Sequence, residues 1–273
     1  MRPIQTISIL GAGWLGMPLG EKLAKAGFNI NGSTTRTEKI VEISKKGMNA
    51  FLLDIDQEIK APGLEKFFNC DLLFVNLPPR RRDPDILTNY PHKMTLILDQ
   101  VKAHQIPYCI FISSTSVYGA QNGVVTEETP TIPSTNSGKA LVQCEQMFLQ
   151  TPNCQTSILR MSGLAGGNRK AGRFLAGKKD LPNGQGKVNL VHLEDCIGVI
   201  EALIEQQEWQ EIFNVCADLH PTRKALYTTQ AGKLGLEPPS FLADSTSNGK
   251  VVSNEKVKKV LGYQFQWPDP MQF

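Results

Sequence analysis

A glycine-rich turn near the amino terminus constrains the fold of this chain more than any other feature. The apolar, β-branched segment 4–10 predicts a buried strand, and it runs directly into Gly11-Ala12-Gly13-Trp14-Leu15-Gly16. Pro18 then favours the first turn of a helix. In such a unit the first glycine permits a tight turn, the second lets backbone approach a pyrophosphate, and the third lets helix and sheet pack closely. The loop therefore predicts a dinucleotide site at a helix amino terminus; the alternative is a tight turn without a ligand.

The first 160 residues continue to alternate strand and helix patterns. Buried strand patterns recur at 28–32, 50–53, 72–75, 108–113 and 156–159, and helical patterns lie between them at 38–46, 87–104 and 143–149. This alternation predicts an α/β fold, a Rossmann-type doubly wound parallel sheet with helices on both faces. Beyond residue 160 glycines interrupt the pattern, and helices resume at 194–207, 223–234 and 255–261. We therefore predict a dinucleotide-binding core over 1–160, and a mixed region over 161–273 that forms a small substrate lobe plus elements returning to the core.

Composition excludes several classes of function. A net charge of +3, with basic residues spread along the chain, does not favour a nucleic-acid partner. No stretch approaches the ~20 apolar residues that span a bilayer. The six cysteines form no C-x-x-C pair and the four histidines are scattered, which predicts buried thiols in a reducing compartment and no metal site. We expect a cytoplasmic protein without a signal peptide, whose partner is a small-molecule substrate.

The segment after the second predicted strand indicates which cofactor is preferred. NAD-binding sites place Asp or Glu there to bind the ribose hydroxyls, whereas this chain has Ser33-Thr34-Thr35-Arg36. Hydroxyls and a guanidinium suit a 2′-phosphate, which a carboxylate would repel. The segment therefore predicts NADP(H) in preference to NAD(H). A solvated loop arginine is the alternative.

Further segments resemble the extended short-chain dehydrogenases/reductases, the NAD-dependent epimerase/dehydratase group. Residues 111–119 (FISSTSVYG) are similar to the end of that group's fifth strand, and 191–195 (VHLED) to its segment before a late helix. Residues 212–215, followed by Thr222, and 261–263 resemble its closing elements. Within the group, 11–18 and 135–139 look most like a bacterial branch, the YeeZ-like proteins. The resemblance spans nearly the whole chain.

The resemblance implies roles for individual residues. Asp54 and Ile55, after the third strand, would contact the adenine. Asn76, Leu77 and Pro78, after the fourth strand, would line the cofactor's ribose. Ser114, followed by Thr115 at the substrate side, matches the catalytic serine that hydrogen-bonds a substrate oxygen. Lys139 matches the lysine that holds the nicotinamide ribose and lowers the pKa of the catalytic tyrosine.

Departures from the family pattern bear on the chemistry. The first glycine of the family's G-x-x-G-x-x-G is Leu10 here, and its Y-x-x-x-K becomes Thr135-Asn136-Ser137-Gly138-Lys139. A neighbouring ammonium can tune a phenol toward neutrality, but it does not bring an aliphatic hydroxyl into range. Thr135 is therefore a poor general acid or base. Tyr118 is a candidate replacement, although aromatic packing is the interpretation that we favour.

Basic side chains point to an anionic substrate. The run Arg80-Arg81-Arg82 follows the predicted ribose-lining turn and would clamp an anion, with a solvated charged loop as the alternative. The same alternatives apply to the basic residues of the glycine-rich segment, which are Arg169, Lys170, Arg173, Lys178 and Lys179. His192 would face the substrate, or it is a hydrogen-bonded structural histidine.

Together these patterns predict an NADP(H)-binding, atypical short-chain dehydrogenase/reductase or epimerase-like protein acting on a small, anionic or nucleotide-sugar-like substrate. The alternative is a non-catalytic NADP(H)-binding redox sensor or regulatory protein, which the missing tyrosine favours and which Ser114 and Lys139 oppose. A β-hydroxyacid dehydrogenase would need a long all-helical carboxyl-terminal domain, and the mixed region after residue 160 does not supply one.

Overall fold

The computed structural model describes residues 3–60, 63–80, 82–243 and 249–273, and the chain forms two compact units. The first unit comprises Met1–Val117, Pro133–Leu159 and Gln207–Ile212. The second comprises Tyr118–Ile132, Arg160–Gln206 and Phe213–Phe273. The sequence predicted one boundary at residue 160. The structure places the earlier segment Tyr118–Ile132 in the second unit and the later segment Gln207–Ile212 in the first. The substrate-binding role of the later region stays a prediction.

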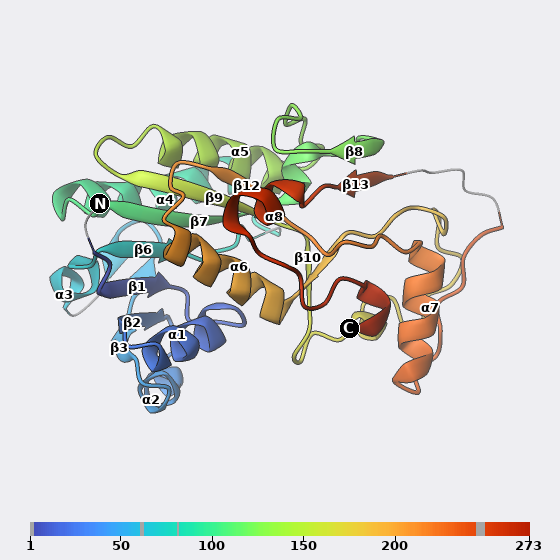
Figure 1. Ribbon diagram of the computed structural model, residues 1–273, viewed down its shortest axis with the longest axis horizontal. Coiled ribbons are helices and arrows are strands. Elements are labelled where there is room, and N and C mark those ends of the chain that lie inside the picture. The colour runs from blue at the N-terminus through green and yellow to red at the C-terminus, as the bar shows by residue number, and fades with distance from the viewer. Residues whose placement is uncertain (1–2, 61–62, 81, 244–248) are drawn as a thin grey trace. The chain divides into compact units, whose positions relative to one another are not determined.

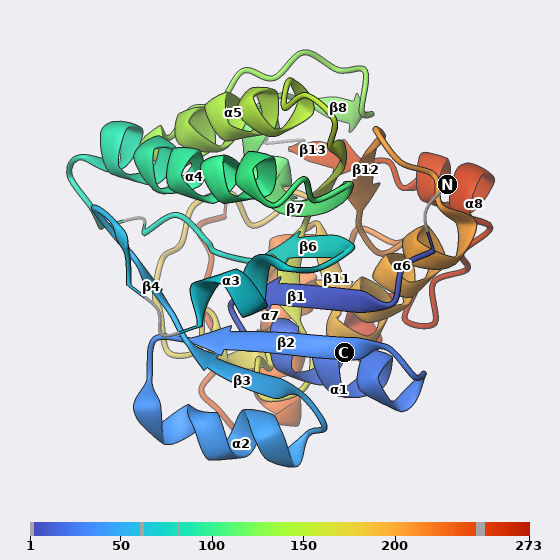
Figure 2. The ribbon, with the colours of Figure 1, turned by 90° about the vertical axis from the view of Figure 1, so that its left-hand side faces the viewer.

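A seven-stranded sheet with the order β12-β9-β7-β6-β1-β2-β3 confirms the predicted fold class. Its strands are β1 (Thr6–Leu10), β2 (Asn29–Thr34), β3 (Asn49–Leu52), β6 (Leu72–Val75), β7 (Tyr108–Ser114), β9 (Gln155–Met161) and β12 (Ile212–Val215). The ladders joining β3, β2, β1, β6 and β7 are all parallel, and Figure 2 shows these strands side by side. The chain leaves β1 toward β2 and later returns to β6 on the other side of β1. Such a reversal of strand order places a ligand crevice at the carboxyl ends of the two strands.

The helices of the first unit bury apolar stripes at helical spacing. In chain order they are α1 (Gly16–Lys25), α2 (Ile40–Lys45), α3 (Leu64–Phe68), α4 (Ile86–Ala103) and α5 (Asn136–Leu149). Met94, Ile97 and Val101 form part of the buried stripe of α4. Helices α4 and α5 lie side by side (Figure 2). A short hairpin of β4 (Asp54–Ile55) and β5 (Ile59–Lys60) follows β3, and the sequence analysis did not predict it.

Helix α5 is longer than the sequence pattern predicted, because it begins at Asn136 rather than at residue 143. Its first turn is polar and contains Gly138, so it shows no apolar periodicity. Deeper in the helix, Glu145 accepts a hydrogen bond of 2.5 Å from the Ser113 hydroxyl, and Phe148 stacks on Phe111 with ring centroids 4.6 Å apart. These contacts join α5 to β7.

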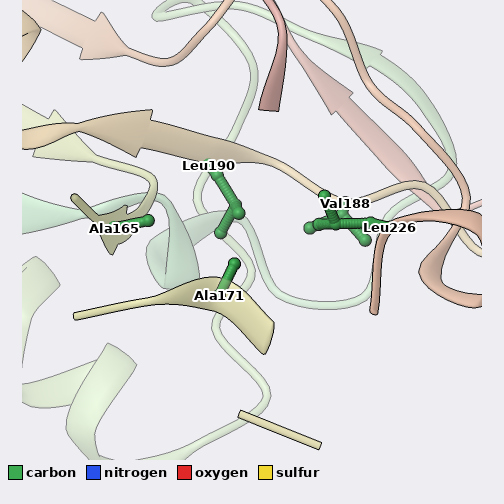
Figure 3. Packing of buried hydrophobic residues seen from close by; sticks show 5 residues of the cluster. All are labelled: Ala165, Ala171, Val188, Leu190 and Leu226. Carbon is green, nitrogen blue, oxygen red and sulfur yellow. The ribbon is translucent and has the colours of Figure 1, made fainter. Parts of the chain in front are cut away.

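The second unit is built from short strands and three helices among its described residues. Its elements are β8 (Gly123–Val125), β10 (Gly163–Ala165), β11 (Leu190–His192), α6 (Leu193–Gln206), α7 (Arg223–Lys233), β13 (Lys250–Val252) and α8 (Glu255–Leu261). Strands β8 and β13 pair in parallel and lie side by side (Figure 1), as do β10 and β11. A small apolar cluster lies between β10, β11 and α7; its members are Ala165, Ala171, Val188, Leu190 and Leu226 (Figure 3).

Within the described ranges, no helix has the length and apolar character needed to cross a membrane. The cysteines are all free, and only Cys70 is not fully buried. No group of three or more His, Cys, Asp or Glu side chains in this part of the chain is arranged to hold a metal ion.

Candidate functional site

The glycine loop between β1 and α1 contains two glycines that the fold itself requires. Gly11 has a φ of +95°, and a Cβ atom there would lie 2.7 Å from the Asn76 carbonyl oxygen. Gly16 begins α1, where a Cβ atom would overlap the Gly11 carbonyl. A side chain at either position would strain the turn, so these glycines are explained without a ligand.

Gly13 differs from the other two glycines of the loop. Apart from Gly13 itself and its two chain neighbours, no described atom lies within 4 Å of a Cβ atom built on Gly13, and its φ lies outside the left-handed range. Neither backbone conformation nor packing within the described chain therefore calls for glycine here. Open space in front of the middle glycine is the arrangement expected where backbone must approach a pyrophosphate.

Polar groups from the strands on either side of β1 hold this loop. The Gly11 N–H donates to the Ser33 hydroxyl at 3.0 Å, and the Ala12 N–H donates to the Ser33 carbonyl at 2.8 Å. From the other side, the Asn76 amide donates to the Gly11 carbonyl at 3.1 Å. Ser33, which the sequence analysis expected to contact the cofactor, is only 3% exposed and its hydroxyl is directed to the loop instead.

The rest of the 33–36 segment reaches the surface. The Thr34 hydroxyl accepts a hydrogen bond of 3.1 Å from the Arg36 N–H, and the side chains of Thr35 and Arg36 are exposed. Arg36 makes no ion pair with any residue in the described ranges. Among the residues predicted to contact a 2′-phosphate, Arg36 is the cation, and its guanidinium is exposed beyond the end of β2.

The residues predicted to contact the adenine lie on β4, and those predicted to line the cofactor's ribose follow β6. Asp54 is exposed, whereas Ile55 is buried beside it. After β6, the Leu77 carbonyl accepts a hydrogen bond of 2.7 Å from the Tyr90 hydroxyl, which ties this turn to α4, and Pro78 is exposed. Both segments thus lie in the first unit, and the Leu77 carbonyl already has a hydrogen-bond partner within the protein.

A half-buried lysine near these segments escaped the sequence analysis. Lys93 lies on α4 with its Nζ atom 3.9 Å from an Asp56 carboxylate oxygen. Burial lowers the pKa of Lys93, and the positive charge of Arg80 lowers it further. Lys93 lies inside a regular helical pattern, so no sequence signal separates it from an ordinary surface lysine. Arg80 itself is exposed, and Arg81 lies outside the described residues.

The two segments that resemble the family's catalytic machinery lie together in the first unit. The Ser114 hydroxyl, at the end of β7, accepts a hydrogen bond of 3.1 Å from the Ser116 N–H, and Thr115 is buried. A Cβ atom on Gly138, in the first turn of α5, would lie 3.2 Å from the Ser116 carbonyl oxygen. Lys139 follows Gly138 in that turn with an exposed side chain. The structure therefore brings the predicted serine and lysine segments side by side.

Thr135, in the position of the family's tyrosine, caps the amino terminus of α5. It has an extended backbone, and its hydroxyl accepts a hydrogen bond of 3.1 Å from the Gly138 N–H. The same hydroxyl lies 3.2 Å from the Ser137 hydroxyl. Threonine is a preferred residue at this position because its oxygen satisfies an otherwise unpaired helix N–H. The sequence signal for this cap was present, but the first turn lacked the apolar pattern that would have placed the helix start there.

Tyr118 in the second unit has a buried hydroxyl with protein partners. It donates to the Asn214 side-chain oxygen at 2.8 Å and accepts from the Arg160 guanidinium at 2.9 Å. Burial raises the pKa of this phenol, which makes it a weaker acid. The arrangement favours the packing interpretation over the role of a replacement acid or base.

His192 in the second unit is packed between aromatic rings. Its ring centroid lies 4.4 Å from that of Trp267 and 5.2 Å from that of Phe273. Its Nδ1 atom accepts a hydrogen bond of 3.3 Å from the Glu194 N–H, and burial lowers its pKa. With 8% of its surface exposed, His192 has the surroundings of the structural histidine that the sequence analysis gave as its alternative.

Asp195, which follows this segment, anchors the carboxyl-terminal residues and was not singled out from the sequence. It is completely buried, and its carboxylate accepts hydrogen bonds from the Tyr263 hydroxyl at 2.8 Å, the Gln266 N–H at 2.7 Å and the Trp267 N–H at 3.1 Å. Burial nevertheless raises the pKa of this carboxyl group, and the hydrogen bonds oppose that rise.

Comparison with known proteins places these features in a family. No family model matches the chain. Solved structures share its fold: a functionally unknown conserved protein from Silicibacter pomeroyi (23% identity, 98% of this chain and 96% of that one, TM-score 0.81) and the UDP-glucuronic acid 4-epimerase of Bacillus cereus in complex with NAD (18% identity, 98% and 96%, TM-score 0.81). Protein YeeZ of Escherichia coli K12 is 39% identical over 271 residues, which are 98% of each chain. The chain therefore belongs to the family of Protein YeeZ.

Proposed function

We propose that the protein binds a nicotinamide dinucleotide on its glycine loop, prefers NADP(H), and has an epimerase- or reductase-like role toward a small anionic or nucleotide-sugar-like substrate. The open space at Gly13 carries this proposal. Gly11 and Gly16 are needed by the turn, but a Cβ atom at Gly13 would meet no described part of the protein beyond its two chain neighbours. The glycine is accounted for if a pyrophosphate takes that space and rests on the amino-terminal end of α1.

Residues of the first unit fit the remaining parts of a dinucleotide. Asp54 and Ile55 would meet the adenine, the turn after Asn76 would line a ribose, and Lys139 would hold the nicotinamide ribose. A bound nicotinamide would supply hydride transfer. Fold likeness supports this assignment, since the Bacillus cereus epimerase was solved with NAD and also with UDP-glucuronic acid and NAD.

The preference for NADP(H) rests on Arg36 in particular. The segment after β2 contains no carboxylate to bind the ribose hydroxyls, and Arg36 is exposed there without an ion-pair partner in the described chain. A guanidinium can bind a 2′-phosphate through two parallel hydrogen bonds. The compared epimerase was solved with NAD, so cofactor choice is a property on which this chain would differ from it.

The substrate proposal rests on the basic residues and on the fold. The exposed Arg80 follows the turn after β6, at the end of the sheet where the glycine loop lies, and it would attract an anion. Ser114 would hydrogen-bond a substrate oxygen. Structures of the same fold were solved with UDP-glucose and UDP-glucuronic acid, which are anionic nucleotide sugars.

A second function, dinucleotide binding without turnover, is favoured by Thr135. The residue in the position of the tunable phenol is a helix cap, and Tyr118 has its hydroxyl buried between protein partners. Neither of these two hydroxyls is free to move a proton at the substrate. The protein would then act as a redox sensor or regulator that reports the bound dinucleotide to a partner.

Fluorescence titration of the wild-type protein with NADPH and NADH tests the proposal. We expect saturable binding of both and tighter binding of NADPH. Absence of saturable binding for either dinucleotide would contradict the proposed function, and equal affinities would contradict the cofactor preference alone. Incubating the protein with dinucleotide and a panel of carbonyl compounds and UDP-sugars then separates the two functions, because an enzyme gives turnover and a sensor gives binding only.

A further inference from the structure

We propose that Ser33 and Asn76 form a clamp that holds the glycine loop ready for its ligand, and that Ser33 is a positioning residue rather than a contact for the 2′-phosphate. The statement about affinity rests on the proposed dinucleotide function. The statement about loop geometry does not.

The clamp holds both polar groups of Gly11. Its N–H donates to the Ser33 hydroxyl at 3.0 Å, and its carbonyl accepts from the Asn76 side chain at 3.1 Å. The carbonyl of Gly11 also accepts the Gly13 N–H at 2.8 Å, which closes the turn. The clamp thus fixes the turn at its first residue, immediately before Gly13.

The sheet order explains how the two side chains reach the same residue. Ser33 lies on β2 and Asn76 follows β6, and these strands flank β1 in the sheet. The backbone of each segment also contacts β1 or the loop: the Ser33 carbonyl accepts the Ala12 N–H at 2.8 Å, and the Asn76 N–H donates to the Leu10 carbonyl at 3.0 Å. These backbone hydrogen bonds fix the positions from which the Ser33 and Asn76 side chains reach Gly11.

Such support matters because a glycine in a free chain adopts φ values of either sign, whereas the turn requires one of them at Gly11. Its φ of +95° allows the chain to leave β1 and turn toward α1. Fixing this turn before the ligand arrives reduces the ordering cost of binding. If the partly buried Gly11 N–H lost its acceptor, other loop conformations would be favoured, since leaving an N–H unpaired away from water is costly.

Burial separates Ser33 from the residues that would read the 2′-phosphate. Ser33 is 3% exposed and its hydroxyl is occupied by Gly11, whereas Arg36 three residues later is exposed. Removing the Ser33 hydroxyl should therefore weaken NADPH and NADH equally. Removing the Arg36 side chain should weaken NADPH alone.

The test combines dinucleotide titration with native-state amide exchange in Ser33→Ala and Asn76→Ala. We expect Ser33→Ala to lower the affinity for both dinucleotides by the same factor, about 2- to 10-fold, the range for one typical hydrogen bond. In the ligand-free protein, the Gly11 amide should exchange faster in Ser33→Ala, and Asn76→Ala should speed exchange at the Gly13 amide that closes the same turn.

Ser8→Ala is the matched control. Ser8 is a fully buried serine on β1, and its hydroxyl accepts a hydrogen bond of 3.0 Å from Asn31, away from the loop. This variant should lose stability yet keep the wild-type affinities and the wild-type exchange at Gly11 relative to the rest of the sheet.

The outcomes separate the clamp from the proposed function. Unchanged Gly11 exchange in Ser33→Ala overturns the clamp, and so does a loss of affinity confined to NADPH. If the wild-type protein binds neither dinucleotide, the proposed function fails, while amide exchange still decides whether the clamp exists.

Discussion

Individual side chains in the first unit serve the backbone at positions where a sequence pattern suggests a ligand. The hydroxyls of Ser33 and Thr135 both accept backbone N–H groups, one from the glycine loop and one from the first turn of α5. Residue type alone does not distinguish these roles, since a hydroxyl can serve a phosphate or an N–H equally well. Burial and hydrogen-bond partners make the distinction, and they leave Arg36 exposed, as the proposed preference for NADP(H) requires.

Arg36→Ala should remove most of the preference for NADPH. The expected loss in NADPH binding is roughly 1.5–3 kcal/mol, the range for a hydrogen bond to a charged group, with little change for NADH. Parallel titrations of wild type and variant with both dinucleotides measure the effect. An unchanged ratio of the two affinities would show that Arg36 does not contact the 2′-phosphate.

Thr135→Ala should destabilise the protein through the loss of a helix cap. The unfolding free energy should fall by about 1 kcal/mol, within the ~0.5–2 kcal/mol typical of such caps, whereas Thr135→Ser should stay near wild type because serine caps equally well. Urea denaturation of the three proteins makes the comparison. Equal stability of the alanine variant and the wild type would contradict the capping role.

At the scale of elements, local patterns predicted most strands and helices of the first unit, but not α3, β4 or β5. Strand 72–75 agrees with β6, and helix 87–104 differs from α4 by one residue at each end, because a buried strand and a long amphipathic helix carry strong periodic signals. The early start of α5 was missed because its polar first turn has no such signal. The pairing of β8 with β13 was also beyond reach, since it joins residues such as Gly123 and Lys250 that are far apart in the chain.

The carboxyl-terminal segment of the second unit should depend on Asp195. Asp195→Ala removes the carboxylate that accepts hydrogen bonds from three donors, the Tyr263 hydroxyl and the backbone N–H groups of Gln266 and Trp267. Hydrogen bonds to a charged group contribute about 1.5–3 kcal/mol each, partly offset here by burial of the carboxylate, so we expect a loss of at least about 2 kcal/mol in unfolding free energy.

Chemical denaturation together with limited carboxypeptidase digestion tests this expectation. Glu205→Ala on α6 is a suitable control, because it removes an exposed carboxylate from the surface of the same unit. Wild-type stability and wild-type resistance to digestion in Asp195→Ala would show that the segment is held by other contacts.

For the whole molecule, membership in the YeeZ family and the Rossmann-type sheet agree with what the sequence indicated. The glycine loop was recognisable because its spacing, its preceding strand and its following helix occur together in the sequence. The resemblance to the family also led to Ser114 and Lys139, whose segments the structure brings together. Tyr118 and His192 could not be assigned in this way, because their partners Arg160, Asn214 and Trp267 come from distant parts of the chain.

Ordinary short-chain dehydrogenase activity should be weak or absent in this protein. Thr135 is not a tunable acid. The phenol of Tyr118 is buried, so it does not readily exchange a proton with a substrate. Lys139→Ala should therefore weaken NADPH binding more than it alters any residual turnover. Reduction of a simple carbonyl compound by the wild type with kcat of about 1–10³ s⁻¹ would contradict this interpretation.

The most direct test of the central claim is the affinity of Gly13→Val for NADPH. The Cβ atom of a valine here would have open space around it, so we expect the variant to fold, to unfold cooperatively like the wild type, and to lose NADPH binding. Gly16→Ala provides the contrast, because its side chain would overlap the Gly11 carbonyl and should reduce stability. A folded Gly13→Val protein that binds NADPH with wild-type affinity would show that the loop is only a turn.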